Sequence, residues 1–191
     1  MAKRQTRQLV EPIKWWEKLD TMELAGRIKL EYDTAPSWLK PQQILIDSIG
    51  IGAGVVDRLR ELGLPVRGVN VSEAPAAVNA DKYSNLRTEL WFDGGLAWFA
   101  NRDVRIPEYY RRPAHEDDLI GELTSVKYKF RPGSGKIAVE SKDEMKKRAM
   151  RSPDLADAFL LTFAATAATL THGGHMTSWR QKISRPIRSI V

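Results

Sequence analysis

The sequence has no cysteine and only three histidines, His115, His172 and His175. Without cysteine the chain cannot form disulfides, thiolate zinc sites or a cysteine nucleophile. The histidines are too scattered along the chain to suggest an imidazole metal triad. Any metal is therefore expected to be held by oxygen or imidazole ligands.

Long apolar segments are also missing. The longest apolar run, residues 159–170, is interrupted by threonines and is too short to span a bilayer. The first residues are basic and lack the apolar stretch that a secretory signal needs. We therefore expect a cytoplasmic protein with no membrane partner.

Several common catalytic and nucleotide-binding motifs are absent. The sequence contains neither a G-x-x-x-x-G-K-[ST] phosphate loop nor a G-x-S-x-G serine-hydrolase motif. Gly50, Gly52 and Gly54 form a glycine run, but the dinucleotide fingerprint requires a glycine where Val55 stands. Dinucleotide binding is therefore an alternative that the glycine spacing disfavours.

Basic residues exceed acidic ones, with 30 Lys and Arg against 24 Asp and Glu and a formal net charge of +6. This excess favours an anionic partner such as nucleic acid, although many basic proteins bind none. The length and ordinary hydrophobic content predict one globular domain, residues 1–171. Residues 172–191 contain no acid and are expected to form a basic, flexible tail.

Hydrophobic periodicity predicts an α/β fold. A nearly apolar strand at 44–49, a glycine loop, a helix at 55–62 and a strand at 65–71 form a βαβ unit, with the first strand buried on both faces. Asp20 is the predicted N-cap of a helix at 21–32. The other predicted elements are strands at 9–16 and 104–106, a hairpin at 126–131 and 136–140, and helices at 85–101, 115–124, 142–150 and 153–170.

Asp47 is the most unusual residue of the predicted strands, because a carboxylate within an apolar strand needs a compensating partner. One interpretation is a structural aspartate that accepts hydrogen bonds from the following glycine loop. The other is a metal ligand at the carboxyl end of the strand, where open α/β sheets place their sites.

Asp154 and Asp157 are three residues apart at the start of an otherwise apolar helix, so both carboxylates can project from one face. They could simply complement the helix dipole or face solvent. Together with Asp47, however, they offer oxygen ligands suited to hard cations such as Mg²⁺ or Mn²⁺. Two such ions bound by shared carboxylates can hydrolyse a phosphodiester.

The segment 140–148 is the densest in mixed charge. It could be an ordinary solvated helix face with Glu-to-Lys pairs. Alternatively, its cations contact DNA phosphates beside the acidic residues. The candidate DNA-binding residues are Lys142, Lys146, Lys147 and Arg148.

Four blocks of sequence resemble the nuclease domain of large terminase subunits from tailed bacteriophages and prophages. They are ILIDSIGIGAGVVDRLRELG, NLRTELWF, IAVESKDEMKKR and SPDLADAFLLTF, in the family's order. The resemblance implies a ribonuclease H-like mixed sheet flanked by helices and a two-metal endonuclease that cleaves concatemeric viral DNA in the bacterial host. It implies catalytic roles for Asp47 and for Asp154 or the neighbouring Asp157. It also implies three packaging partners, namely an ATPase domain, a small terminase subunit and a portal.

Family members usually begin this domain with a strand that carries a first catalytic aspartate, and no residue of this sequence matches it. We therefore expect the central strand beside Asp47 to be absent and the domain to be truncated at its N-terminus. The alternative function is a truncated, non-catalytic module that binds DNA or packaging partners.

Overall fold

The computed structural model describes residues 1–111 and 119–164. The predicted start of a helix at 115–118, the helical residues predicted beyond 164, the three histidines and the basic tail 172–191 lie outside the described residues. Among the described residues, none of the helices is both long and apolar enough to cross a membrane.

The predicted βαβ unit is confirmed. Strand β3 (Ile44–Asp47) runs parallel to β4 (Val66–Val69), with Ile44 opposite Val66 and Asp47 opposite Val69. Helix α2 (Gly52–Glu61) makes the crossover, and α1 (Thr21–Thr34) packs against it. The small core of this unit consists of Ala25, Val55, Leu59 and Leu64.

Helix α1 begins where the sequence predicts. The Asp20 carboxylate accepts hydrogen bonds from the amides of Met22 and Glu23, both at 2.8 Å, and the Glu23 side chain accepts one from the Asp20 amide. This reciprocal capping satisfies amides that have no partner inside the helix.

The helix predicted at 85–101 is a continuous helical segment with a wide turn in its middle. It consists of α3 (Leu86–Glu89), the π-helical segment η3 (Leu90–Leu96) and α4 (Ala97–Phe99). Gly94 and Gly95 lie in η3, where they allow close contact with Phe163 and Leu160. The two glycines, which weaken an isolated helix, are therefore required by packing.

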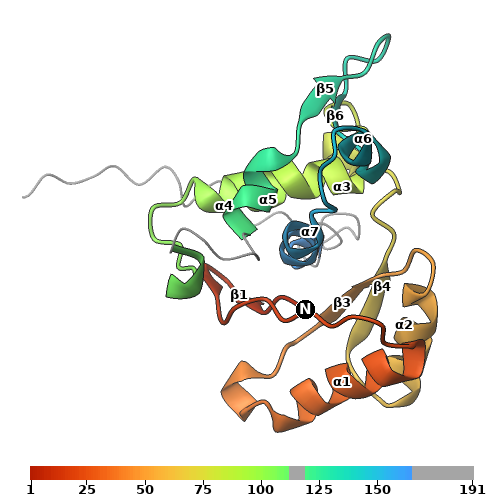
Figure 1. Cartoon of the computed structure of the whole chain (residues 1–191), viewed down its shortest axis with the longest axis vertical. Helices are drawn as coiled ribbons and strands as arrows, with labels where there is room; N and C mark the ends of the chain where they lie inside the picture. Colours follow the sequence, from red (N-terminus) through yellow and green to blue (C-terminus); the bar gives the residue numbers. More distant parts are fainter. Residues whose placement is uncertain (112–118, 165–191) are drawn as a thin grey trace, which may run out of the picture.

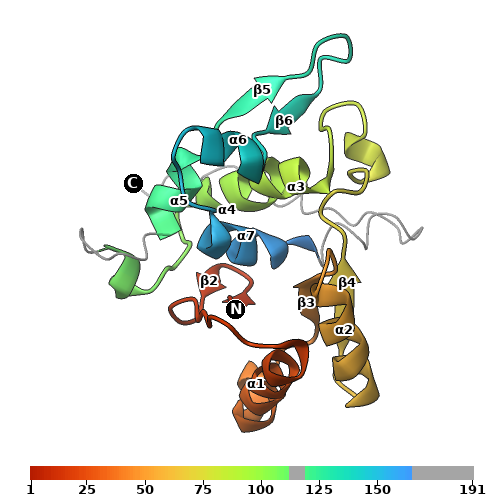
Figure 2. The same cartoon turned by 45° about the vertical axis from the view of Figure 1, so that its right-hand side comes forward.

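Helix α7 (Asp154–Leu161) lies between the βαβ unit and the α3–η3–α4 segment in both views (Figures 1 and 2). Phe159 is fully buried and contacts the aromatic ring of Trp98 edge to face. Helix α5 (Leu119–Ser125) also packs on α7, with Leu119 fully buried. The main core is therefore built around the helix that carries Asp154 and Asp157.

The predicted hairpin is confirmed as β5 (Tyr128–Phe130) paired antiparallel with β6 (Ile137–Val139), and it projects from the molecule (Figure 2). Helix α6 (Lys142–Lys147) follows directly after β6 and begins with a Ser141–Glu144 capping box. The chain thus brings Lys142 from the base of the hairpin toward α7.

Three predictions about strands are wrong. The segment 9–16 is not a strand; instead β1 (Arg4–Gln5) and β2 (Gln8–Leu9) form a small antiparallel pair, and the predicted strand 104–106 is reduced to a single bridge between Arg105 and Gln8. The strand at 44–49 ends at Asp47, and its residues are not fully buried. An apolar run in the sequence does not reveal whether a segment will find a partner strand or be covered on both faces.

The fold is mixed α/β, but the described residues form three separate two-stranded sheets rather than one larger sheet. Within this part of the chain, β3 hydrogen-bonds to β4 and has no strand on its other edge. The remaining regular elements are the short 3-10 helices Ser37–Leu39, Ala77–Asn79 and Glu108–Arg111.

Candidate active site

Asp47 is the last residue of β3 and is exposed at the carboxyl end of the strand. Its Oδ1 accepts a hydrogen bond of 3.1 Å from the amide of Ile49. The loop that follows is held tightly, since a Cβ on Gly52 would lie 1.8 Å from the Asp47 carbonyl oxygen. Asp47 therefore has both the loop contact of a structural aspartate and the accessible position of a ligand.

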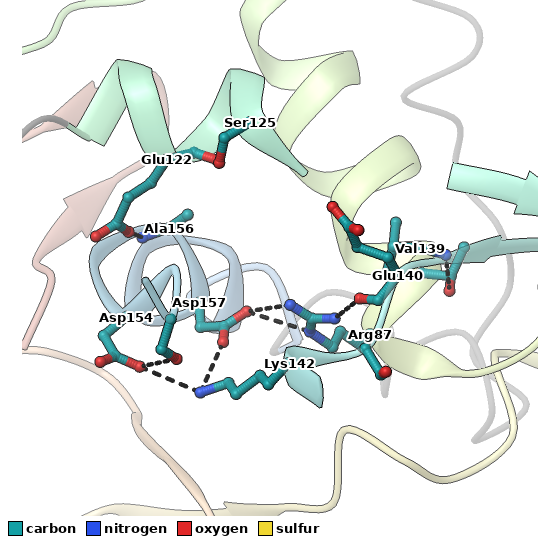
Figure 3. Close-up of polar contacts among 12 residues, drawn as sticks. Arg87, Glu122, Ser125, Val139, Glu140, Lys142, Asp154, Ala156 and Asp157 are labelled. Carbon is teal, nitrogen blue, oxygen red and sulfur yellow. Dashed lines mark hydrogen bonds and ion pairs between the residues drawn. The ribbon is translucent and has the colours of Figure 1, made fainter. Parts of the chain in front are cut away.

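Asp154 and Asp157 project from the first turn of α7 toward the same cation (Figure 3). Lys142 Nζ lies 3.1 Å from Asp154 Oδ1 and 3.1 Å from Asp157 Oδ2. The Asp154 side chain is 75% exposed and also accepts a hydrogen bond of 2.7 Å from Ser152 Oγ, whereas that of Asp157 is 25% exposed. The two carboxylates thus converge as the spacing predicts.

Arg87 on α3 holds the other oxygen of Asp157. Its Nε and Nη2 donate to Asp157 Oδ1 at 3.3 and 3.2 Å, and its Nη1 donates to the Glu140 carbonyl at 2.7 Å. The Arg87 side chain is only 14% exposed. The guanidinium therefore ties α3, the end of β6 and α7 together beside the acidic residues (Figure 3).

Strand β3, which ends at Asp47, contacts helix α7. The charges of Asp157 and Lys142 therefore act on the Asp47 carboxylate. Partial burial raises the pKa of Asp47, and the nearby negative charge of Asp157 acts in the same direction, against the Ile49 amide and the Lys142 ammonium. For Asp154, burial is outweighed by hydrogen bonds from Ser152 and Lys142, which lower its pKa. Lys142 is partly buried, but Asp157 and Asp154 raise its pKa, so it is charged at neutral pH.

Sequence reasoning missed Glu122 of α5. Its Oε2 accepts a hydrogen bond of 2.8 Å from the Ala156 amide at the start of α7. Burial raises the pKa of Glu122, and the charges of Asp154 and Asp157 act in the same direction. The sequence carries no signal for this contact, whereas Arg87 at least lies within the block NLRTELWF that resembles the terminase nucleases.

The carboxylate oxygens of Asp47, Asp154 and Asp157 are donor atoms of the kind that hard divalent cations prefer. Within residues 1–111 and 119–164, however, no three acidic or histidine side chains form a ready-made metal site. Asp154 and Asp157 are instead paired with Lys142 and Arg87. A cation bound by these carboxylates would compete with the Lys142 ammonium.

The other basic residues singled out in the sequence differ in their surroundings. Lys146 and Lys147 are exposed, and Lys146 lies 3.7 Å from Asp143. Arg148 pairs with the buried carboxylate of Glu140 and donates to the Ser125 carbonyl at 3.1 Å. Arg148 thus has a structural partner, whereas Lys146 and Lys147 are more accessible.

Several solved structures have a similar fold. A lysine-to-alanine mutant nuclease domain of the large terminase subunit gp2 of bacterial virus Sf6, with manganese and β-thujaplicinol, is 20% identical over 91% of this chain and 81% of that chain, with a TM-score of 0.65. A mutant structure of the same domain with calcium is 21% identical over 84% and 79% of the two chains, with a TM-score of 0.64. The domain without that mutation is 19% identical over 91% and 81%, with a TM-score of 0.59. No protein-family model and no curated protein sequence matches the chain.

The likeness covers most of both chains and establishes the fold. The chain has the mixed α/β fold of a phage terminase nuclease domain, as the resemblance of its sequence blocks implies. At these identities, the likeness to solved structures does not assign an activity.

Proposed function

We propose that this chain is the nuclease module of a phage terminase large subunit, a metal-dependent endonuclease that cleaves concatemeric viral DNA in the bacterial cytoplasm. One observation carries the proposal: Asp154 and Asp157, from a helix start, converge on Lys142, and their helix α7 contacts strand β3, which ends at Asp47. The likeness of the fold to a terminase nuclease domain also supports the proposal.

The residues divide into two groups by chemistry. Asp47, Asp154 and Asp157 would hold one or two Mg²⁺ or Mn²⁺ ions, which when bound would activate water and stabilise the leaving oxygen. Lys142 bridges Asp154 and Asp157 and lowers the pKa of Asp154. Lys146 and Lys147 are exposed and would contact DNA phosphates. Lys142 and Arg148 are further candidates for phosphate contacts.

A nuclease of this kind would act on duplex DNA delivered by a packaging motor. We therefore propose the terminase ATPase domain, the small terminase subunit and the portal as partners. Phosphate contacts are independent of base sequence, so removing Lys146 or Lys147 should weaken binding to every DNA sequence equally.

The experiment is cleavage of supercoiled plasmid in Mn²⁺ by the wild type, Asp47→Asn and Asp154→Asn. Asparagine retains an oxygen for the Ile49 amide but removes the charge, so we expect each variant to lose about 100-fold or more in rate. Asp57→Asn is the matched control, since Asp57 is an exposed acid of α2 paired with Arg60. Cleavage that survives in Asp47→Asn and Asp154→Asn would refute the proposal.

A second candidate is a module that binds DNA or a packaging partner without cutting. The observation in its favour is that Asp154 and Asp157 are already neutralised by Lys142 and Arg87. Gel shifts with duplex DNA, combined with no nicking in either Mn²⁺ or Mg²⁺, would support this second function instead of the nuclease.

A further inference from the structure

The amides at the start of α7 need acceptors from outside the helix. The first amides of any helix have no partner within it. The N-cap residue of α7 is Pro153, which makes no side-chain capping bond. An acid in the first turn would ordinarily be attracted to these amides and to the positive end of the helix dipole. Asp154 does not need to serve this purpose, because its carboxylate is bonded to Ser152 and Lys142.

Glu122 supplies the missing acceptor from a different helix. Its Oε2 accepts a hydrogen bond of 2.8 Å from the Ala156 amide, and the nearby Leu155 amide also lowers the pKa of this carboxyl group. Figure 3 shows Glu122 reaching the helix start on the side opposite Lys142. Helix α5 is fixed by the fully buried Leu119, so the acceptor is delivered by a rigid element.

We propose that Glu122 is a positioning residue for the aspartates: by capping α7 from outside, it frees Asp154 and Asp157 to face Asp47 and hold a divalent cation. The inference rests on the proposed nuclease function. Without Glu122, the free amides would compete with Ser152 and Lys142 for the Asp154 carboxylate.

Hydrogen bonds and charge act on Glu122 in opposite directions: burial and the negative charges of Asp154 and Asp157 raise its pKa, whereas the amides of α7 lower it. Glu122 lies close enough to Asp154 and Asp157 for their charges to act on it. The ion pairs of Lys142 and Arg87 are with Asp154 and Asp157. The role of Glu122 therefore lies in its contact with the backbone at the start of α7.

The test compares Glu122→Ala and Glu122→Gln with Asp20→Ala. Glutamine can still accept a hydrogen bond from the Ala156 amide, whereas alanine cannot. Asp20 caps α1, which packs against α2 and is remote in sequence from α7, so Asp20→Ala controls for a general loss of helix capping. All the measurements use the whole chain.

In the metal-free protein, Glu122→Ala should accelerate hydrogen exchange of the Ala156 amide about tenfold. It should also shift the carboxyl ¹³C resonances of Asp154 and Asp157, by more than Glu122→Gln does, while Asp20→Ala leaves them in place. Unchanged carboxyl resonances in Glu122→Ala would overturn the positioning role. This readout does not depend on nuclease activity.

Calorimetry with Mn²⁺ provides the second readout. We expect Glu122→Ala to weaken Mn²⁺ binding about tenfold, with most of the affinity restored in Glu122→Gln. Equal losses in Glu122→Ala and Asp20→Ala would show a purely structural cap and would overturn the inference. If the wild type binds no Mn²⁺ and cuts no DNA, the proposed nuclease function fails. The carboxyl resonances of Asp154 and Asp157 in the metal-free protein would still decide the role of Glu122.

Discussion

Gly95 lies where the π-helical segment η3 meets helix α7, and its replacement by alanine tests whether this close contact holds α7 in place. A Cβ at this position would lie 2.4 Å from Leu160 Cδ2. Leu160 is 2% exposed, so its side chain has little room to move away. Because α7 carries Asp154 and Asp157, a shift of this helix would also disturb the acidic cluster.

The expected change in the free energy of unfolding on Gly95→Ala follows from two opposing effects. Forcing an extra methyl group into a packed core costs about 1–3 kcal/mol, whereas alanine favours a helical backbone over glycine by roughly 1 kcal/mol. We therefore expect Gly95→Ala to lower the free energy of unfolding by about 1 kcal/mol. Gly26→Ala in α1 is the control, because no atom lies within 4 Å of its added Cβ, and it should stabilise the protein.

Urea denaturation measures these differences, and a double mutant tests their cause. Valine at position 160 lacks Cδ2, and the next Leu160 atom, Cγ, is 3.8 Å from the added Cβ, which is ordinary contact. In the Leu160→Val background, Gly95→Ala should therefore no longer destabilise the protein. The reasoning is refuted if Gly95→Ala stabilises the wild type as much as Gly26→Ala does, or if Leu160→Val leaves its cost unchanged.

Two further predictions concern charged groups. In Lys142→Met, Asp154 and Asp157 lose the cation that they share. The pKa of Asp154 should therefore rise in an NMR titration, and Mn²⁺ should bind more tightly in calorimetry. Weaker Mn²⁺ binding would contradict this prediction and mean that Lys142 assists metal binding. Burial and the Asp93 carboxylate raise the pKa of Tyr83 to about 12, so the neutral phenol is favoured in the folded state. Stability should therefore fall as pH rises from about 10 through 12, and urea denaturation of Tyr83→Phe should show a smaller fall.

Local sequence signals determined several elements of the fold. The Asp20 cap, the βαβ unit around α2 and the β5–β6 hairpin depend on patterns within short segments, where capping and hydrophobic periodicity act directly on the backbone. The spacing of Asp154 and Asp157 likewise placed both on one helix face, which the structure confirms.

Tertiary packing alone decided how these elements make a site. Hydrophobic periodicity could not show that, among the described residues, β3 has a partner strand on one edge only. Nor could it show that Gly94 and Gly95 allow Phe163 and Leu160 to pack closely against η3. It also could not show that Lys142 bridges Asp154 and Asp157, or that Glu122 caps their helix. These contacts join segments that are distant in the chain, and such distances depend on how the cores pack rather than on the pattern within any one segment.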